Sequence, residues 1–110
     1  INIVHLNDPR LDVRATADFF ADVDRQLPPT RGPRGEPSVG DLQVYDLLAI
    51  VDRFATGFAA LPELIPGRAD YRVLIASSRL VRAYSVVGQL APDGAVELIA
   101  IEFDLGADWS

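Results

Sequence analysis

Arginine side chains gather in one stretch of this chain, and they have the clearest potential for chemistry. Residues 68–84 contain four arginines and one acid, Asp70, so the stretch carries a local charge of +3. A planar guanidinium group donates paired hydrogen bonds to a carboxylate or a phosphate. We therefore predict an anion-binding or partner-binding site, for which the candidates are Arg68, Arg72, Arg79, Arg82 and Tyr84.

A structural role for the same arginines is the alternative. Residues 93–110 contain five acids and no basic residue, a local charge of −5. If the two stretches lie on adjacent strands, arginine–carboxylate pairs would form between them, each worth about 0.2–1 kcal/mol. Such pairs would neutralise the basic patch.

Two further segments hold candidate partner-binding residues. Residues 28–40 contain four prolines and three glycines, a composition that excludes helix interiors and central strands. We expect a mobile loop here, either a solvated connector or a partner contact through Arg31 and Arg34. Near the end of the chain, Trp109 lies among acidic residues and could anchor a partner.

Several classes of site are not expected. The chain has no cysteine, and His5, its one histidine, has no partner at metal-ligand spacing, so we expect no metal and no cofactor. Ser77 and Ser78 have no base nearby in sequence, and no glycine-rich phosphate loop follows a strand. The catalytic residues are therefore unknown, and the sequence leaves open whether the protein is an enzyme.

Length and composition indicate one globular unit. At 110 residues, 49% hydrophobic and 24% charged, we expect a single domain spanning 1–110. No apolar run approaches the roughly 20 residues that a membrane span needs, and no secretory signal pattern is present, so we expect a cytoplasmic protein without membrane contact. The net charge of −6 makes nucleic acid an unlikely partner.

Three successive strands are predicted in the last third of the chain, at residues 71–76, 80–87 and 95–104. Pro92, Asp93 and Gly94 have the residue types of a hairpin turn. Plain alternation along the last strand would place Glu97, Ile99, Ile101 and Phe103 on one face. The short connections predict an antiparallel arrangement.

One strand and two helices are predicted upstream. Residues 1–7 alternate like a short strand, and Asp8-Pro9 is a typical helix start. The first helix runs from there to Pro28. Asp41 would cap the second helix, which has Asp46, Asp52 and Arg53 on its solvated side. Its apolar stripe is formed by Val44, Leu47, Leu48, Val51, Phe54, Phe58 and Leu61.

The predicted fold is therefore α+β. Its element order is β-α-α-β-β-β, with two helices packed on one face of an antiparallel sheet.

Three segments resemble the toxin subunits of the RelE/ParE superfamily. Residues 58–64, Phe-Ala-Ala-Leu-Pro-Glu-Leu, look like the end of that family's second helix. Residues 79–86 resemble its central strand, with Arg79, Tyr84 and Val86 at the matching positions, and residues 96–101 resemble the strand that follows. The resemblance implies a bacterial, growth-inhibiting toxin that an antitoxin neutralises by docking on it, with messenger RNA cleavage or gyrase inhibition as activity.

Acidic residues follow the last predicted strand, where the ribonuclease branch carries basic residues and a catalytic residue, and they would repel RNA. We therefore expect a small protein-binding domain, resembling such a toxin but without ribonuclease activity, that binds a protein partner or forms a homodimer. The alternative is a small α+β enzyme or ligand-binding domain with an apolar pocket between helices and sheet. Its lining would be Phe19, Phe54, Phe58, Tyr71 and Tyr84.

Overall fold

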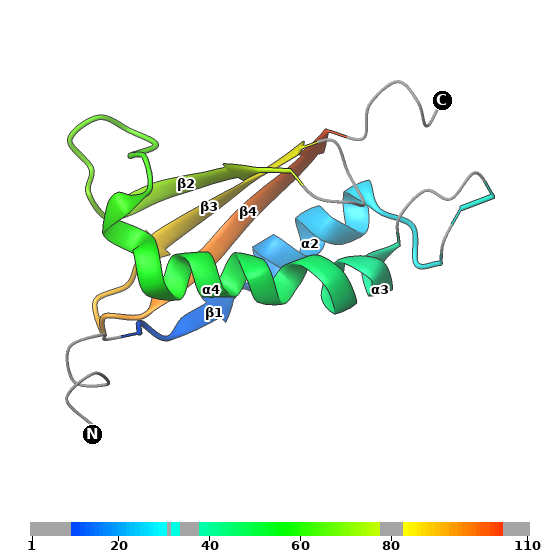
Figure 1. Cartoon of the computed structure of the whole chain (residues 1–110), viewed down its shortest axis with the longest axis horizontal. Helices are drawn as coiled ribbons and strands as arrows, with labels where there is room; N and C mark the ends of the chain where they lie inside the picture. The colour runs from blue at the N-terminus through cyan, green and yellow to red at the C-terminus, as the bar shows by residue number, and fades with distance from the viewer. Residues whose placement is uncertain (1–9, 31, 34–37, 78–82, 105–110) are drawn as a thin grey trace.

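The computed structural model describes residues 10–30, 32–33, 38–77 and 83–104. In these residues helices pack on one face of a four-stranded sheet, which confirms the α+β class (Figure 1). The expected strand at residues 1–7 lies outside the described residues. The elements are β1 (Val13–Ala15), α2 (Ala17–Gln26), α3 (Val39–Asp41), a π-helical turn (Leu42–Asp46), α4 (Leu47–Gly57), a 3-10 turn (Phe58–Ala60), β2 (Tyr71–Ala76), β3 (Ala83–Leu90) and β4 (Val96–Asp104).

The sheet is mixed, with strand order β1-β4-β3-β2. Its last three strands form the predicted antiparallel meander, and Gly94 in the β3–β4 turn has a positive φ of 91°. The prediction of a purely antiparallel sheet is wrong for β1, which pairs with β4 in parallel. Between β1 and β4 the chain passes through the helices and through β2 and β3, and a connection of this length permits parallel pairing.

The first helix begins later than predicted. A start at Asp8-Pro9 is wrong because residues 13–15 form β1. The helix begins at Ala17, where the Thr16 hydroxyl caps it by accepting a hydrogen bond of 3.2 Å from the Phe19 N–H. The same hydroxyl donates to the Leu98 carbonyl of β4 at 2.8 Å. One threonine thus ends β1, starts α2 and joins both to the sheet.

Two side chains of α2 complete the backbone hydrogen bonding of β4 beyond the end of β1. Asp22 accepts a hydrogen bond from the Ile101 N–H at 3.1 Å. The Gln26 amide donates to the Ile101 carbonyl at 2.7 Å and accepts from the Phe103 N–H at 2.8 Å. Hydrogen bonds from Arg25 and from the Ile101 N–H hold the pKa of the Asp22 carboxyl below its usual value. The helix therefore takes the place of a further strand at this edge.

The second helical segment begins with a capping box. Ser38 is the N-cap and Asp41 its third-residue partner, so the prediction that Asp41 itself caps the helix is wrong. The π-helical turn Leu42–Asp46 then shifts the buried stripe. Asp46 is only 7% exposed and Leu48 is 77% exposed, the reverse of the predicted pattern. A turn with one extra residue rotates the following positions around the helix axis, and sequence periodicity does not reveal it.

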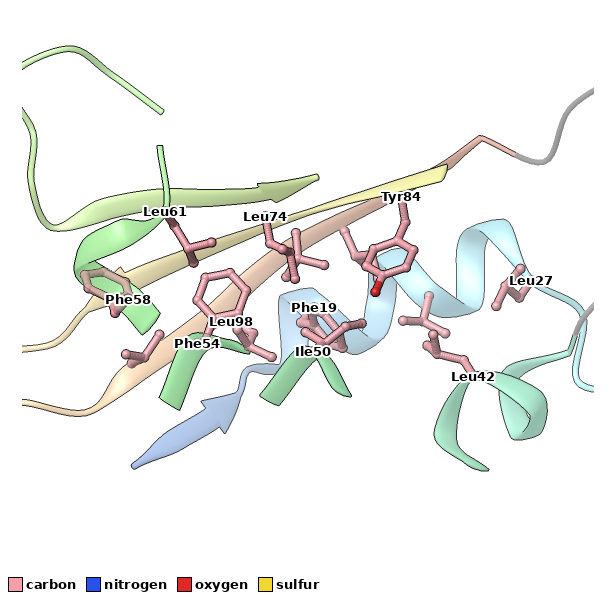
Figure 2. Packing of buried hydrophobic residues seen from close by; sticks show 14 residues of the cluster. Phe19, Leu27, Leu42, Ile50, Phe54, Phe58, Leu61, Leu74, Tyr84 and Leu98 are labelled. Carbon is pink, nitrogen blue, oxygen red and sulfur yellow. The ribbon is translucent and has the colours of Figure 1, made fainter. Parts of the chain in front are cut away.

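The core lies between the sheet and the helices, as Figure 2 shows. α4 approaches β3 closely at Gly88, where a Cβ atom would lie 2.4 Å from Cε1 of the Phe54 ring. Only a residue without a side chain allows this approach. The largest fully buried side chains are Phe19, Phe54, Ile50, Leu74, Leu98, Ile101, Val23, Val86 and Val96.

A β-bulge interrupts the alternation of β4. Gly88 pairs with Leu98 while Val87 pairs with Ala100, so Ile99 is an extra residue. Before the bulge Val96 and Leu98 are buried, and after it Ile101 is buried. The plain alternation predicted for this strand is therefore wrong, because one inserted residue reverses the faces that follow it.

We predict that Gln26→Ala lowers the free energy of unfolding by about 1–2 kcal/mol, because it leaves the Ile101 carbonyl and the Phe103 N–H without their partner. Urea unfolding followed by circular dichroism measures the change. The control is Asp24→Ala on the exposed side of the same helix, which should stay within about 0.5 kcal/mol of the wild type. Equal urea midpoints for the two variants would contradict the role given to Gln26.

Candidate functional site

The helices cover one face of the sheet, and the other face points away from them (Figure 1). Strand register places Val73, Val87 and Ala100 in one row across β2, β3 and β4 on this face. Each is only partly buried, whereas the residues that alternate with them on β2 and β3 lie on the core side. We call this surface the open face.

Beside the apolar row lies a second row formed by Ile75, Ser85 and Glu102. Ile75 is 72% exposed, an unusual degree for an aliphatic side chain in a strand. Its exposure follows from its place on β2, which is an edge strand. A shallow hollow of about 240 Å³ opens here, lined by Ile75, Ala83, Tyr84, Ser85, Glu102, Phe103 and Asp104.

At the other end of the open face, charged side chains form ion pairs. Arg14 of β1 pairs with Asp93 at 2.9 Å and with Glu97 at 3.3 Å. The hydrogen bond from Arg14, together with one from the Ala95 N–H, lowers the pKa of the Asp93 carboxyl. Exposed pairs of this kind add little stability. They do fix the charges at this end of the face, so the apolar surface has a polar border.

Arg68 binds residues that lie close to it in the sequence. Its guanidinium donates two hydrogen bonds to Asp70, at 3.0 and 2.9 Å, and lies 4.7 Å from the centre of the Tyr71 ring. These hydrogen bonds lower the pKa of the Asp70 carboxyl. Arg68 thus shapes the loop that leads into β2.

Arg72 lies on the core side of the sheet, in register with Gly88, and its side chain is only 14% exposed. Its guanidinium donates to the carbonyls of Leu61, Ala69 and Ala59 at 2.8, 2.8 and 3.2 Å. It also lies over the Phe58 ring at 5.7 Å. Arg72 joins the 3-10 turn after α4 to the start of β2.

Tyr84 points from β3 toward the helices, at the end of the sheet away from Arg72 (Figure 2). Burial, and then the nearby carboxylate of Asp46, raise the pKa of its hydroxyl, while Arg53 lowers it. The structure therefore does not bring Arg68, Arg72 and Tyr84 into one site. The remaining candidates, Arg31, Arg34, Arg79, Arg82 and Trp109, lie outside the described residues and stay predictions.

Among the described residues, Arg68 and Arg72 do not form the ion pairs expected with the acidic stretch, and the pairs expected of Arg79 and Arg82 lie outside the described residues. Asp93 and Glu97 pair with Arg14, and Glu102 lies 3.7 Å from Arg25 of α2. The reason is the strand order, since β4 lies between β3 and β1 and does not touch β2. Arg68 and Arg72 on the β2 side therefore cannot reach these acids.

Four of the five predicted pocket-lining aromatics belong to the core. Phe19, Phe54, Phe58 and Tyr84 are buried in one hydrophobic cluster, so they fill the space between helices and sheet. Tyr71 lies outside this cluster, beneath Arg68. Within the described ranges there is no group of three or more His, Cys, Asp or Glu residues placed to hold a metal ion. Nor do these ranges contain a helix long and apolar enough to cross a membrane.

Comparison with known proteins identifies no relative. No family model, no curated protein and no solved structure matches this chain.

Sequence reasoning predicted an anion site of Arg72, Arg82 and Tyr84 on the open face, but Arg72 and Tyr84 lie on the core side. It missed the apolar character of the open face, although a signal for it exists. Both alternating sets of residues 71–76 are largely apolar, with Val73 and Ile75 on one side and Leu74 and Ala76 on the other. A strand with a solvated face normally carries polar residues on that face. An apolar second face therefore indicates a surface that something else covers.

We predict that Tyr84→Phe reduces the loss of stability at high pH. Because its pKa is raised in the fold, the folded protein keeps the Tyr84 proton at pH values where the unfolded chain has lost it. This contribution is complete below about pH 10 and is lost as the pH rises through the folded pKa. Urea unfolding at several pH values between 8 and about 11 measures it. Tyr71→Phe is the matched control, and identical pH profiles for the two variants would contradict the prediction.

Proposed function

We propose that this chain is a small protein-binding domain that docks a protein partner on the open face. The observation that carries this proposal is the exposed Ile75 beside the apolar row of Val73, Val87 and Ala100. Burying an exposed isoleucine contributes about 1.5–3 kcal/mol, so a surface of this composition favours association.

The polar border of the open face supports the same proposal. Stable interfaces combine an apolar centre with a polar, solvent-accessible rim. Here the apolar row lies between the Arg14–Glu97 pair at one end and Glu102 at the other. A shallow surface of this kind suits a protein partner better than a small molecule, which needs a deeper pocket.

The resemblance to RelE/ParE toxins extends this proposal to a toxin-like subunit without ribonuclease activity, neutralised by its partner. Two helical segments between the first strand and the final meander, as observed in the described residues, are compatible with the element order of that family. The net charge of −6 disfavours contact with RNA.

A second candidate function, a small enzyme or ligand-binding domain, depends on one observation. Asp46 is 7% exposed, at the end of the π-helical turn, and its carboxylate is close enough to Tyr84 to raise the pKa of the tyrosine. π-helical turns occur frequently at functional sites, and buried ionisable groups often have catalytic roles. The two candidates differ in location, since one uses the open face and the other the core side of the sheet.

We predict that Ile75→Asp abolishes partner binding and Leu48→Asp does not. Both residues are highly exposed aliphatics, but Leu48 lies on α4, away from the open face. Placing a charge on an aliphatic residue that the partner buries should weaken binding at least about a hundredfold. Native mass spectrometry of the tagged chain purified from its source cell measures the complex. A wild-type chain without a partner, or equal behaviour of the two variants, would contradict the proposal.

The toxin-like extension predicts that induction of the chain in a bacterial host arrests growth. Ile75→Asp should relieve the arrest if the open face contacts the cellular target, and Leu48→Asp should not. Growth curves after induction, with expression levels matched by immunoblot, provide the measurement. Normal growth with the wild-type chain would remove the toxin-like extension and leave the protein-binding domain.

A further inference from the structure

We propose that the segment that docks on the open face is a basic, amphipathic piece of a partner protein. It places an aliphatic side chain against Ile75 and the hollow, and a lysine or arginine against Glu102. This inference rests on the proposed function and adds the chemistry of the partner to it.

The hollow beside Ile75 defines the apolar part of the contact. Ile75, Ser85 and Glu102 are in register on three neighbouring strands. Adjacent strands lie about 4.8 Å apart, so Ile75 and Glu102 are separated by about 10 Å. An aliphatic side chain and a basic side chain on one face of a partner segment span this distance.

Among the described residues, the edge of β2 is covered before Ile75 but not at it. The Val73 N–H donates to the Pro62 carbonyl and the Tyr71 carbonyl accepts from the Leu64 N–H, so a short preceding segment covers the first half of this edge. Backbone groups of alternate residues point the same way in an antiparallel strand, so those of Ile75 also point outward. Ile75 lies beyond the covering segment, where a partner can reach both its side chain and the edge.

The charge around the hollow selects a basic partner. From Ala83 to Asp104 the chain has four acids and no basic residue. Arg14 holds two of them, Asp93 and Glu97, at the far end of the face. Within the described part of the chain, Glu102 at the hollow has a 3.7 Å contact with Arg25, which pairs more closely with Asp22, at 2.8 Å. A basic side chain of a partner can therefore bind Glu102 at little cost.

The same charges argue against other occupants. A nucleic acid or an acidic peptide would place its negative charges beside the exposed Glu102. Like charges placed together across an interface cost several kcal/mol in unfavourable cases. A second copy of the chain would bring the same acidic rim against itself unless it docked in another orientation.

Two synthetic peptides of equal length test the proposal, one with alternating faces of leucine and lysine and the other with leucine and glutamate. Each is titrated into the ¹⁵N-labelled full chain and followed by amide chemical shifts. We expect the lysine peptide to shift the amides of Ile75, Ser85 and Glu102, and to bind at least about tenfold tighter than the glutamate peptide.

A chain of net charge −6 attracts any basic peptide, so matched variants are needed to distinguish binding at the hollow from non-specific electrostatic binding. Glu102→Gln should weaken binding about three- to fivefold, and Asp24→Asn, the same charge change on the exposed side of α2, should have less than half that effect. Ile75→Ser should weaken binding about tenfold, whereas Leu48→Ser on α4 should leave it unchanged.

Three results would overturn the inference. The first is equal binding of both peptides at the open face, which rejects the basic partner but keeps the face as a docking surface. The second is equal sensitivity to Glu102→Gln and Asp24→Asn, or no shift at the named amides. The third is a dimer, seen by sedimentation at rising concentration and lost in Ile75→Ser, which would place a second copy on the face. Failure of the proposed function is recognised separately, by the absence of a co-purifying partner for the wild-type chain.

Discussion

The contact between α2 and the edge of β4 is the constraint on which the arrangement of this fold depends. β1 pairs with only three residues of β4, and beyond them Asp22 and Gln26 satisfy the backbone groups of Ile101 and Phe103. Their spacing of four residues places both on one side of the helix. Because unpaired backbone groups are costly when partly buried, this contact holds α2 parallel to the strand and directs Phe19 into the core. Both helices then cover the same face of the sheet and leave the other one exposed.

The bulge at Ile99 decides which side chains of β4 reach each face. Without the extra residue, the side that carries Val96 and Leu98 would continue through Ala100 to Glu102 and place a carboxylate in the core. With it, Ile101 enters the core and Glu102 reaches the open face. One inserted residue therefore completes the hydrophobic core and at the same time gives the hollow its acidic rim. The same β-bulge therefore determines both the packing of the core and the composition of the candidate site.

Sequence reasoning succeeded where local chemistry dominates. The strand at 71–76 and the turn at Pro92-Asp93-Gly94 follow from alternation and turn residues, and both are observed. It failed where tertiary contacts override local signals. Asp8-Pro9 has the residue types of a helix start, but the helix is capped by Thr16. The position of the cap depends on the pairing of β1 with β4, which local sequence does not show. The burial of Asp46 was also out of reach, since a π-helical turn has no periodic signature.

The arginines show why residue type alone does not identify a site. A cluster in sequence suggested shared chemistry, yet Arg72 joins the 3-10 turn to the start of β2 by binding three carbonyls, and Arg68 orders a loop through Asp70. Arg14 pairs with Glu97, an acid of β4 that the strand order brings to it. The described arginines with known contacts thus stabilise the fold, and a guanidinium held by several carbonyls offers few donors to a ligand. What the fold leaves exposed is apolar, with Ile75 at its edge, and an apolar surface with an acidic border favours binding of a protein over chemistry on a small molecule.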